Sequence, residues 1–339
     1  MESNQKDQKY RKYGFKDYSL WLFPNIVNLC VLRGKCPCKC IHCPVGTISI
    51  SERLEKFGDE CVSLELYEKI TNEMRIYPHT TLRIHGVGEP LLWDNLIDAL
   101  KISKKLGVRT WLFTSLVTSN KEIIKKLVRY CDIIEISVNS RSRGDYFKTK
   151  GIDAFEVVCD NIKIMLSEKQ EHDWGSRILT SRVESQHIGE DRAFIEYWKD
   201  TDIDDSFIRT FHTYNDALEN SLNKKAQNSI CCLVHWSRFN IDCDGKAVLC
   251  FNELFKNKKA PDEMIIGDVT QNSIKYIWQS SDRLNKVRLA QLKQDYGIIN
   301  FASYIPCIDC VSCQPIDGDR PTSEYQINLL KKSRNKSRN

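Results

Sequence analysis

Apolar and polar positions follow two alternating patterns along residues 25–211. Short apolar runs, such as NIVNLCVL at residues 25–32, are typical of buried strands. Longer stretches in which apolar residues recur at helical spacing, such as residues 63–77 and 92–107, are typical of amphipathic helices. Ser63 is placed to cap the first of these helices, and Gly107 is placed to end the second. The pattern therefore predicts alternating strands and helices.

The strand–helix unit repeats along the same segment. Further strands are expected at residues 81–86, 108–114, 132–139, 177–184 and 204–211, and further helices at 120–131, 154–166 and 191–200. Repeats of this kind indicate an α/β fold with a parallel sheet. About six units are present, fewer than the eight of a closed barrel, so the sequence predicts a partial (β/α)6 barrel over residues 25–211.

The pattern changes after residue 211. Residues 212–230 are polar and are expected to form a linker, whereas residues 231–320 combine short strands, one helix at 273–292 and clustered cysteines. This second region is too small and loop-rich for a large core, so we expect metal ligation to stabilise it. Residues 1–24 read as a polar extension, and residues 321–339 as a basic, disordered tail.

Composition narrows the functional classes. The chain has 339 residues and 15 cysteines, with neither an apolar run long enough to span a membrane nor the apolar segment of a secretory signal. We therefore expect a cytoplasmic protein whose thiols serve metals or redox chemistry and not a disulfide framework. The net charge of +5 lies largely in the tail, where a solvated terminus is favoured over a nucleic-acid or membrane contact.

Three cysteines form the spacing Cys36-x3-Cys40-x2-Cys43, with Cys38 as an extra thiol between them. Three thiolates on a short loop can converge on a [4Fe–4S] cluster and leave its fourth iron open to a small molecule's amine and carboxylate. Cys38 or His42 can also complete four ligands, so spacing alone leaves zinc open.

A second motif, Gly86-Val87-Gly88-Glu89-Pro90, follows the strand at residues 81–86. The glycines let the backbone approach a ligand closely, and Glu89 offers an acceptor to an ammonium group. The turn lies one strand–helix unit after the cysteine loop, at the carboxyl edge of the expected sheet, where α/β folds bind ligands.

Together these motifs resemble the radical S-adenosylmethionine superfamily, whose signature is CxxxCx(aromatic)C followed by a GGEP-type turn. The resemblance covers roughly residues 25–210. It implies that Cys36, Cys40 and Cys43 hold the S-adenosylmethionine-binding [4Fe–4S] cluster and that the backbone at His42 contacts adenine. It further implies that Gly86, Gly88, Glu89 and Pro90 receive the methionine amine of S-adenosyl-L-methionine.

Two further positions are carried over from the same family. EISVNS resembles the strand whose serine approaches the ribose, which implies that role for Ser137. Lys150 stands where the family has an arginine for the methionine carboxylate, and an ammonium cannot form the bidentate fork. The usual TNG after the third strand is replaced by Thr114-Ser115-Leu116.

The C-terminal region resembles SPASM and twitch modules, which carry auxiliary iron–sulfur clusters. That resemblance implies one auxiliary [4Fe–4S] cluster, with a structural zinc site as the alternative. Cys30, Cys61, Cys131 and Cys159 are expected to be plain core thiols. The assigned auxiliary ligands are Cys232, Cys250, Cys307 and Cys310, with Cys313, Cys231 and Cys243 as rivals.

The resemblance implies an oxidoreductase that cleaves S-adenosylmethionine to a 5′-deoxyadenosyl radical, which abstracts a substrate hydrogen. With the auxiliary cluster as electron acceptor, the expected reaction is oxidation of a small polyol, sugar or aminocyclitol. The expected partners are this small molecule and a one-electron reductant such as flavodoxin or ferredoxin. The acid–base group is not assigned, since His187, Glu184 and His235 cannot be ranked.

Two other functions remain open. One is peptide modification with a separate leader-binding partner, because only about 25 residues precede the first strand, too few for a domain of that kind. The other, from a different class, is a non-catalytic metal-binding protein that contacts RNA through its basic tail.

Overall fold

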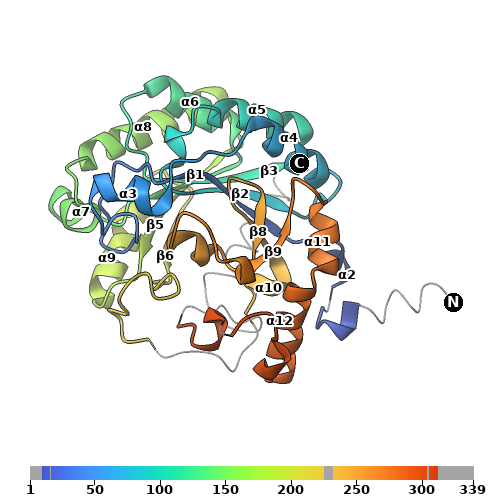
Figure 1. The fold of residues 1–339 in the computed structure, drawn as a ribbon. Coiled ribbons are helices and arrows are strands. Elements are labelled where there is room, and N and C mark those ends of the chain that lie inside the picture. Colours follow the sequence, from blue (N-terminus) through green and yellow to red (C-terminus); the bar gives the residue numbers. More distant parts are fainter. Residues whose placement is uncertain (1–9, 16, 225–231, 304, 312–339) are drawn as a thin grey trace.

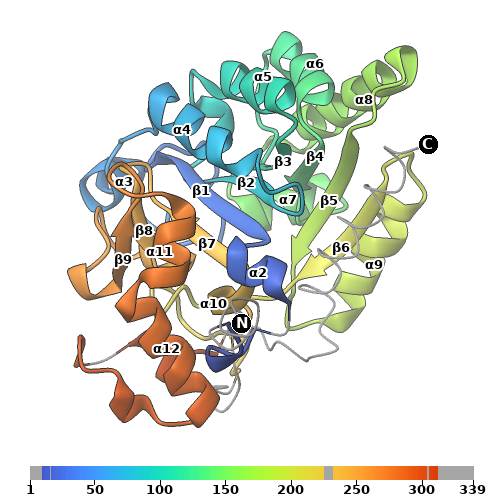
Figure 2. The ribbon, with the colours of Figure 1, turned by 90° about the vertical axis from the view of Figure 1, so that its right-hand side faces the viewer.

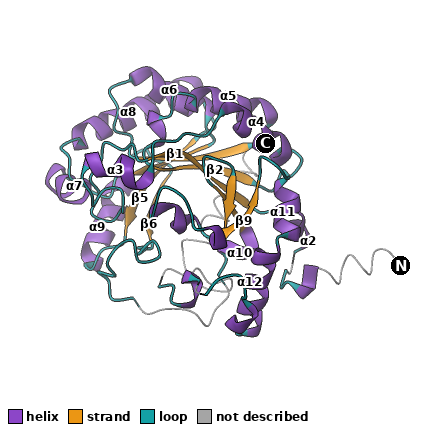
Figure 3. Cartoon of the chain, in the orientation of Figure 1, coloured by secondary structure: helices purple, strands orange, loops and turns teal. Residues whose placement is uncertain are grey.

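A nine-stranded sheet organises the chain (Figures 1 and 3), in a computed structural model that describes residues 10–15, 17–224, 232–303 and 305–311. The strand order is β6-β5-β4-β3-β2-β1-β7-β8-β9. The strands are β1 (Ile26–Arg33), β2 (Thr81–Val87), β3 (Arg109–Thr114), β4 (Ile133–Ser137), β5 (Arg177–Val183), β6 (Asp205–Arg209), β7 (Arg238–Ile241), β8 (Lys246–Val248) and β9 (Ile265–Asp268).

Helices cover the outer face of the parallel strands, with α4, α5, α6 and α8 side by side over β1 to β5 (Figures 1 and 2). The α-helices are α2 (Tyr18–Leu22), α3 (Ile50–Phe57), α4 (Leu64–Met74), α5 (Leu96–Leu106), α6 (Lys121–Tyr130), α7 (Arg143–Lys150), α8 (Phe155–His172), α9 (Ile188–Lys199), α10 (Val234–Ser237), α11 (Ile274–Ser280) and α12 (Asp282–Lys293). None of the helices within the described segments is both long and apolar enough to cross a membrane.

The predicted partial barrel is confirmed. Strands β1 to β6 pair in chain order, all parallel. Ser63 caps α4 by accepting a hydrogen bond from the Leu66 N–H, and Gly107 ends α5 in the left-handed conformation at φ 68°. Both positions were predicted from local sequence, because each effect is local to one helix end.

Two aspects of the secondary structure differ from the prediction. The single helix expected at residues 273–292 is two helices, because Ser281 is extended and its hydroxyl caps α12 through the Leu284 N–H. Helices α2, α3, α7 and α10 were not predicted. Helix α2 lies in the segment expected to be a polar extension, and Ser49 and Glu52 form a full capping box at the start of α3.

The C-terminal region continues the barrel sheet. Strand β7 pairs in parallel with β1, with Ile26 opposite Arg238 and Leu29 opposite Ile241 (Figure 2). Buried Asn28 donates from Nδ2 to Asn240 Oδ1 across this pair at 2.8 Å. Strands β8 and β9 then add antiparallel. The sequence did not predict this junction, since it pairs strands about two hundred residues apart.

The alternation of side chains along each strand separates the outer core from the barrel interior. In β2, Leu82 and Ile84 pack outward into the main hydrophobic core, whereas Arg83 and His85 point inward. A small apolar cluster, separate from the main core, lies on the other face of the same strands. Its members are Trp111, Ile133, Leu179 and Phe207.

Candidate active site

A cavity of about 330 Å³ opens at the carboxyl ends of the parallel strands and extends into the barrel interior. Every site residue predicted from sequence that the structure describes lines this one cavity. They are Cys36, Cys40, His42, Cys43, Gly86, Gly88, Glu89, Pro90, Ser137, Lys150, Cys232, Cys250, Cys307 and Cys310. The rival auxiliary ligands Cys313 and Cys231 lie outside the described residues, as does the basic tail.

Backbone contacts hold the cysteine loop in place. The N–H groups of Lys39 and Ile41 donate to the carbonyls of Lys150 and Thr149 at 2.7 and 3.1 Å. Gly46 lies so close to the loop that an added Cβ would stand 2.3 Å from the Cys40 carbonyl oxygen. These contacts fix the loop against the end of α7, and they pack its last residue, Gly46, against Cys40. The thiols face the cavity as a result.

A buried arginine contacts the same loop from α3. Arg53, 1% exposed, donates from Nη1 to the Cys36 carbonyl at 2.7 Å. Its positive charge therefore lies beside the thiols, where negative charge develops when they bind metal. This contact was not predicted, because α3 itself was not predicted.

Three of the loop thiols, those of Cys38, Cys40 and Cys43, have a raised pKa. Burial raises the pKa of Cys43 to about 11, and a hydrogen bond to Cys36 raises the pKa of Cys38 to about 12. Protonated thiols do not ligate metal, so cluster binding must release protons here. Three thiols on one loop fit the [4Fe–4S] donor set, and buried Cys38 lines the cavity as a fourth.

Glu89 is 3% exposed and accepts four hydrogen bonds. Its Oε1 accepts from the Thr114 hydroxyl at 2.6 Å and the Leu91 N–H at 3.2 Å, and its Oε2 from the Ser115 hydroxyl and N–H at 2.5 and 2.7 Å. The residues that replace the family's usual TNG thus orient this carboxylate. Hydrogen bonding of this kind fixes it as an acceptor for a cation in the cavity.

The glycines beside Glu89 are required by close backbone approach. A Cβ on Gly88 would stand 2.5 Å from the Lys35 carbonyl oxygen, and one on Gly86 would stand 2.8 Å from the Gly88 carbonyl oxygen. The Glu89 N–H also donates to the Lys35 carbonyl at 2.8 Å. The turn and the cysteine loop are therefore directly connected.

Ser137 and Lys150 meet across the cavity wall. Lys150, 2% exposed, donates from Nζ to the Ser137 hydroxyl at 3.3 Å. Burial lowers the pKa of Lys150, but the thiols of Cys40, Cys38 and Cys36 outweigh burial and raise the pKa above its ordinary value. Lys150 thus stays charged and can meet a carboxylate as a point charge.

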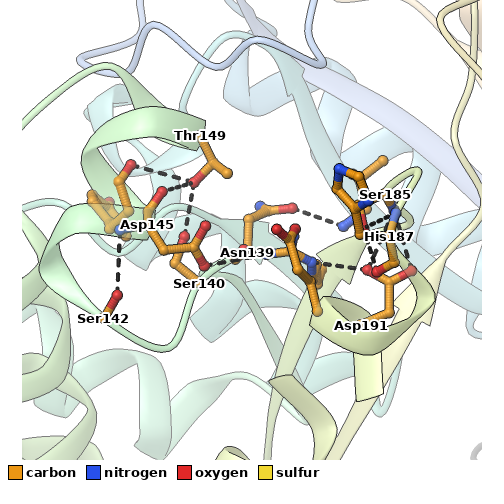
Figure 4. Close-up of polar contacts among 12 residues, drawn as sticks. Asn139, Ser140, Ser142, Asp145, Thr149, Ser185, His187 and Asp191 are labelled. Atoms are coloured by element: carbon orange, nitrogen blue, oxygen red, sulfur yellow. Dashed lines mark hydrogen bonds and ion pairs between the residues drawn. The ribbon is translucent and has the colours of Figure 1, made fainter. Parts of the chain in front are cut away.

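The segment after β4 is held by a polar network (Figure 4). Asn139 adopts φ 62°, donates to the Ser137 hydroxyl at 2.7 Å and accepts from the Val183 N–H at 2.7 Å. Arg182, whose side chain is 5% exposed, pairs with Asp145, Glu190 and Asp191. This network positions Ser137 and the start of α7 against β5.

The auxiliary thiols gather on the other side of the cavity. Burial raises the pKa of Cys307 well above its ordinary value, and the neighbouring thiols of Cys250, Cys232 and Cys310 raise it further. Four mutually interacting thiols supply the donor set of a four-thiolate cluster. Cys243 is separate from them, since its neighbours are Cys30, Asp242 and Arg33 and it does not line the cavity.

The three acid–base candidates fall in different places. His235 lines the cavity and lies 3.9 Å from the Cys307 sulfur through Nε2, and burial lowers its pKa to about 4. His187 is exposed at the start of α9, where its carbonyl accepts from the Ser185 hydroxyl at 2.9 Å (Figure 4). Glu184 pairs with Lys224. Neither Glu184 nor His187 lines the cavity.

Sequence reasoning missed the polar groups inside the barrel. Cavity-lining residues that were not singled out are Arg83, His85, Glu135, Arg209, His212 and Arg238. A signal was present in TLRIHG, where Arg83 and His85 occupy the alternate positions of a strand whose other face is apolar. Polar residues at inward positions of a barrel strand mark its interior as a site.

Residues 231–311 match the SPASM family of iron–sulfur cluster-binding domains. An uncharacterized protein of Methanocaldococcus jannaschii is 42% identical over 135 residues, which are 39% of this chain and 41% of that protein. The match therefore spans less than half the length of this curated relative.

Solved structures share the fold at low sequence identity. SuiB of Streptococcus suis bound to its precursor peptide SuiA superposes with a TM-score of 0.63 at 14% identity, over 97% of this chain and 77% of SuiB. Native anSMEcpe with bound AdoMet superposes with a TM-score of 0.57 at 13% identity, over 93% of this chain and 99% of anSMEcpe. BtrN in complex with AdoMet and 2-DOIA superposes with a TM-score of 0.51 at 13% identity, over 87% of this chain and 95% of BtrN.

Proposed function

We propose that this chain, which has the fold of the radical S-adenosylmethionine enzymes joined to a SPASM iron–sulfur cluster-binding domain, uses S-adenosylmethionine to oxidise a small molecule. One observation carries the proposal: the cysteine loop, the Glu89 turn and the second set of thiols all line one cavity. Chance placement of motifs from such distant parts of the chain does not bring them onto one surface.

The residues present fit the two groups that the fold implies. Cys36, Cys40 and Cys43 would hold a cluster with one open iron, and Cys232, Cys250, Cys307 and Cys310 would hold an auxiliary one. When bound and reduced, the first cluster supplies the electron that splits the sulfonium of S-adenosylmethionine, and the resulting 5′-deoxyadenosyl radical takes a substrate hydrogen.

The protein's own residues bind and orient the cosubstrate. Glu89, held by Thr114 and Ser115, accepts from the methionine ammonium, while Lys150 meets the methionine carboxylate. Ser137 is placed beside Lys150 for the ribose, and the His42 backbone for the adenine. The enclosed, partly aromatic wall excludes water from the reacting carbon.

An oxidation is favoured because the second thiol set shares the substrate cavity. An acceptor there lies beside the substrate carbon that has lost its hydrogen. The same cavity would also hold S-adenosylmethionine and both clusters, which favours a compact substrate such as a polyol, sugar or aminocyclitol derivative.

Modification of a peptide side chain is the second candidate. It is supported by the similarity in fold to SuiB bound to its precursor peptide, which extends over 97% of this chain. A side chain of a partner peptide would then occupy the same cavity, so the two candidates share their radical chemistry and differ in the substrate.

Anaerobic reconstitution tests the shared chemistry. We expect about eight irons per chain, falling to about four when Cys36, Cys40 and Cys43 are all changed to Ala. Dithionite and S-adenosylmethionine should then release 5′-deoxyadenosine only from the wild-type protein. Zinc in place of iron at both sites, or no 5′-deoxyadenosine from a chain with both clusters, contradicts the proposal. Assays with small polyols or sugars and with peptides then separate the two candidates, by showing which class of substrate the protein converts.

A further inference from the structure

Most arginines enclosed by this fold have hydrogen-bond acceptors. Arg33 binds Asp242, half-buried Arg209 binds Glu135, and Arg182 binds three carboxylates. Arg53 and Arg288 donate to backbone carbonyls. Arg83 is also buried, at 5% exposure, yet it donates no hydrogen bond to any residue in the described segments, and its Nε is buried without a partner. A guanidinium taken out of water without an anion is costly, so its retention requires a reason.

Arg83 is held in place by aromatic rings and not by an anion. Its guanidinium carbon lies 4.4 Å from the centre of the Phe113 ring and 5.2 Å from that of Trp111. Cation–π contacts of this kind orient the guanidinium and leave its N–H groups available. The Arg83 side chain lines the cavity from β2, one inward position before His85. It therefore lies deeper along this strand than the turn that carries Glu89.

The charges around Arg83 leave one positive charge uncompensated. Glu135, the nearby carboxylate, is bound through two oxygens by Arg209, with Nε to Oε1 at 2.5 Å. Arg238 lies beside Cys232 and Cys250, so its charge faces the auxiliary thiolates. Arg83 therefore lines the cavity without an anion of its own among the described residues.

Two histidines beside it are neutral donors. His85 stacks on Phe113 at 4.0 Å with its Nε2 buried and unpaired, and His212 lines the cavity with its Nδ1 unpaired. Burial lowers the pKa of His85 well below its ordinary value and that of His212 to about 3. Each ring can donate one hydrogen bond without adding charge.

We infer that the substrate carries a carboxylate and that Arg83 binds it, with His85 and His212 as neutral hydrogen-bond donors. A single planar guanidinium matches a carboxylate, which has one charge and two coplanar oxygens. A phosphate ester, with up to two charges, would leave one charge unpaired in the same surroundings. The inference rests on the proposed function and narrows its substrate to acids, such as a sugar acid or an acidic side chain.

The test uses acetate, a small carboxylate, on the reconstituted protein. Unfolding temperature is measured anaerobically at constant ionic strength while acetate, methyl phosphate or chloride is titrated. We expect acetate to raise the unfolding temperature of the wild type saturably, and methyl phosphate and chloride to raise it less. Arg83→Gln should lose at least half of the acetate shift, and Arg83→Lys, which keeps the charge without the fork, should fall between the two.

Arg143→Gln is the matched control, because Arg143 is an exposed arginine paired with Asp153, and it should keep the full acetate shift. An acetate shift in Arg83→Gln equal to that of the wild type overturns the inference, and so does a larger shift with methyl phosphate. Without added anion, Arg83→Gln should unfold no earlier than the wild type. If Arg83→Gln lowered the unfolding temperature as much as Arg182→Gln does, Arg83 would be a structural residue and the inference would be wrong. Release of 5′-deoxyadenosine, measured separately, decides the proposed function independently.

Discussion

Arg33 at the end of β1 and Asp242 after β7 form a buried ion pair that joins the barrel to the cysteine-rich region. The Arg33 Nε donates to Asp242 Oδ1 at 2.9 Å, and the Arg33 Nη2 donates to Asp242 Oδ2. The two side chains are 1% and 6% exposed. The Arg33 Nη1 also donates to the carbonyls of Phe57, Leu254 and Asn257. One guanidinium thus connects β1, α3 and the loop after β8.

Asp242→Asn should therefore destabilise the whole chain. It leaves the Arg33 charge buried and uncompensated, which costs about 3–5 kcal/mol in the free energy of unfolding. Asp98→Asn, which breaks an exposed pair with Lys101, should cost less than about 1 kcal/mol. Denaturant titration measures both variants. A similar, small loss in both would show that the ion pair does not couple the two regions.

The barrel could be predicted because its signals are local, whereas the Arg33–Asp242 pair could not. Each strand and helix of residues 25–211 carries its own periodicity, and Ser63 and Gly107 act within one helix end. Arg33 and Asp242 are about two hundred positions apart, and nothing in either neighbourhood specifies the other. The same holds for the pairing of β7 with β1.

The candidate site also has a part that could be predicted from local sequence and a part that could not. The cysteine loop and the Glu89 turn are short motifs with fixed spacing, so they could be recognised in the sequence. The residues that orient them did not stand out, because Thr114 and Ser115 appeared only as a departure from the family pattern. Arg83 and its neighbours were missed because charged residues in a strand are ordinarily read as solvent-facing.

Gly46→Ala should disrupt the first cluster site. The new methyl group would stand 2.3 and 2.4 Å from the carbonyl oxygen and nitrogen of Cys40, which are backbone atoms and cannot move aside independently. We expect the iron content of reconstituted protein to fall by about four per chain. Gly144→Ala is the control, since no atom lies within 4 Å of its added Cβ, and in helix α7 it should stabilise the fold by about 0.5–1 kcal/mol. Full iron content in Gly46→Ala would mean that the loop can rearrange.

Cys38→Ser should keep the first cluster. Cys38 is buried beside Cys36 and Cys40 but falls outside the three-cysteine spacing. Iron analysis and S-adenosylmethionine cleavage should match the wild type, whereas Cys40→Ser should lose about four irons. Loss of the cluster in Cys38→Ser would reassign the ligand set.

The pH dependence of stability should report the enclosed His212. Burial in the cavity, aided by the charges of Arg238 and Lys224, lowers its pKa from 6.5 to about 3 in the folded chain. Between about pH 3 and 6.5, His212 therefore binds a proton in the unfolded chain but not in the folded chain. The stability that this group contributes is present above about pH 6.5 and is lost as the pH falls, by at most about 1.4 kcal/mol per pH unit. His212→Gln should flatten the unfolding free energy between about pH 5 and 6.5, and an unchanged slope would show that His212 titrates as in water.

Thr114→Val should weaken S-adenosylmethionine binding without removing the cluster. The change deletes the 2.6 Å hydrogen bond to Glu89 Oε1 and the acceptor for the Leu116 N–H, while it keeps the side chain's shape. A hydrogen bond to a charged group contributes about 1.5–3 kcal/mol, so affinity should fall by about ten-fold or more if the bond orients Glu89 for the ammonium. Thr118→Val, which removes only an exposed bond to the Asn120 N–H, should bind as the wild type does. Equilibrium binding to reconstituted protein, with iron measured in the same samples, separates a loss of affinity from a loss of cluster. Equal affinity in both variants would mean that Ser115 and the Leu91 N–H hold Glu89 without Thr114.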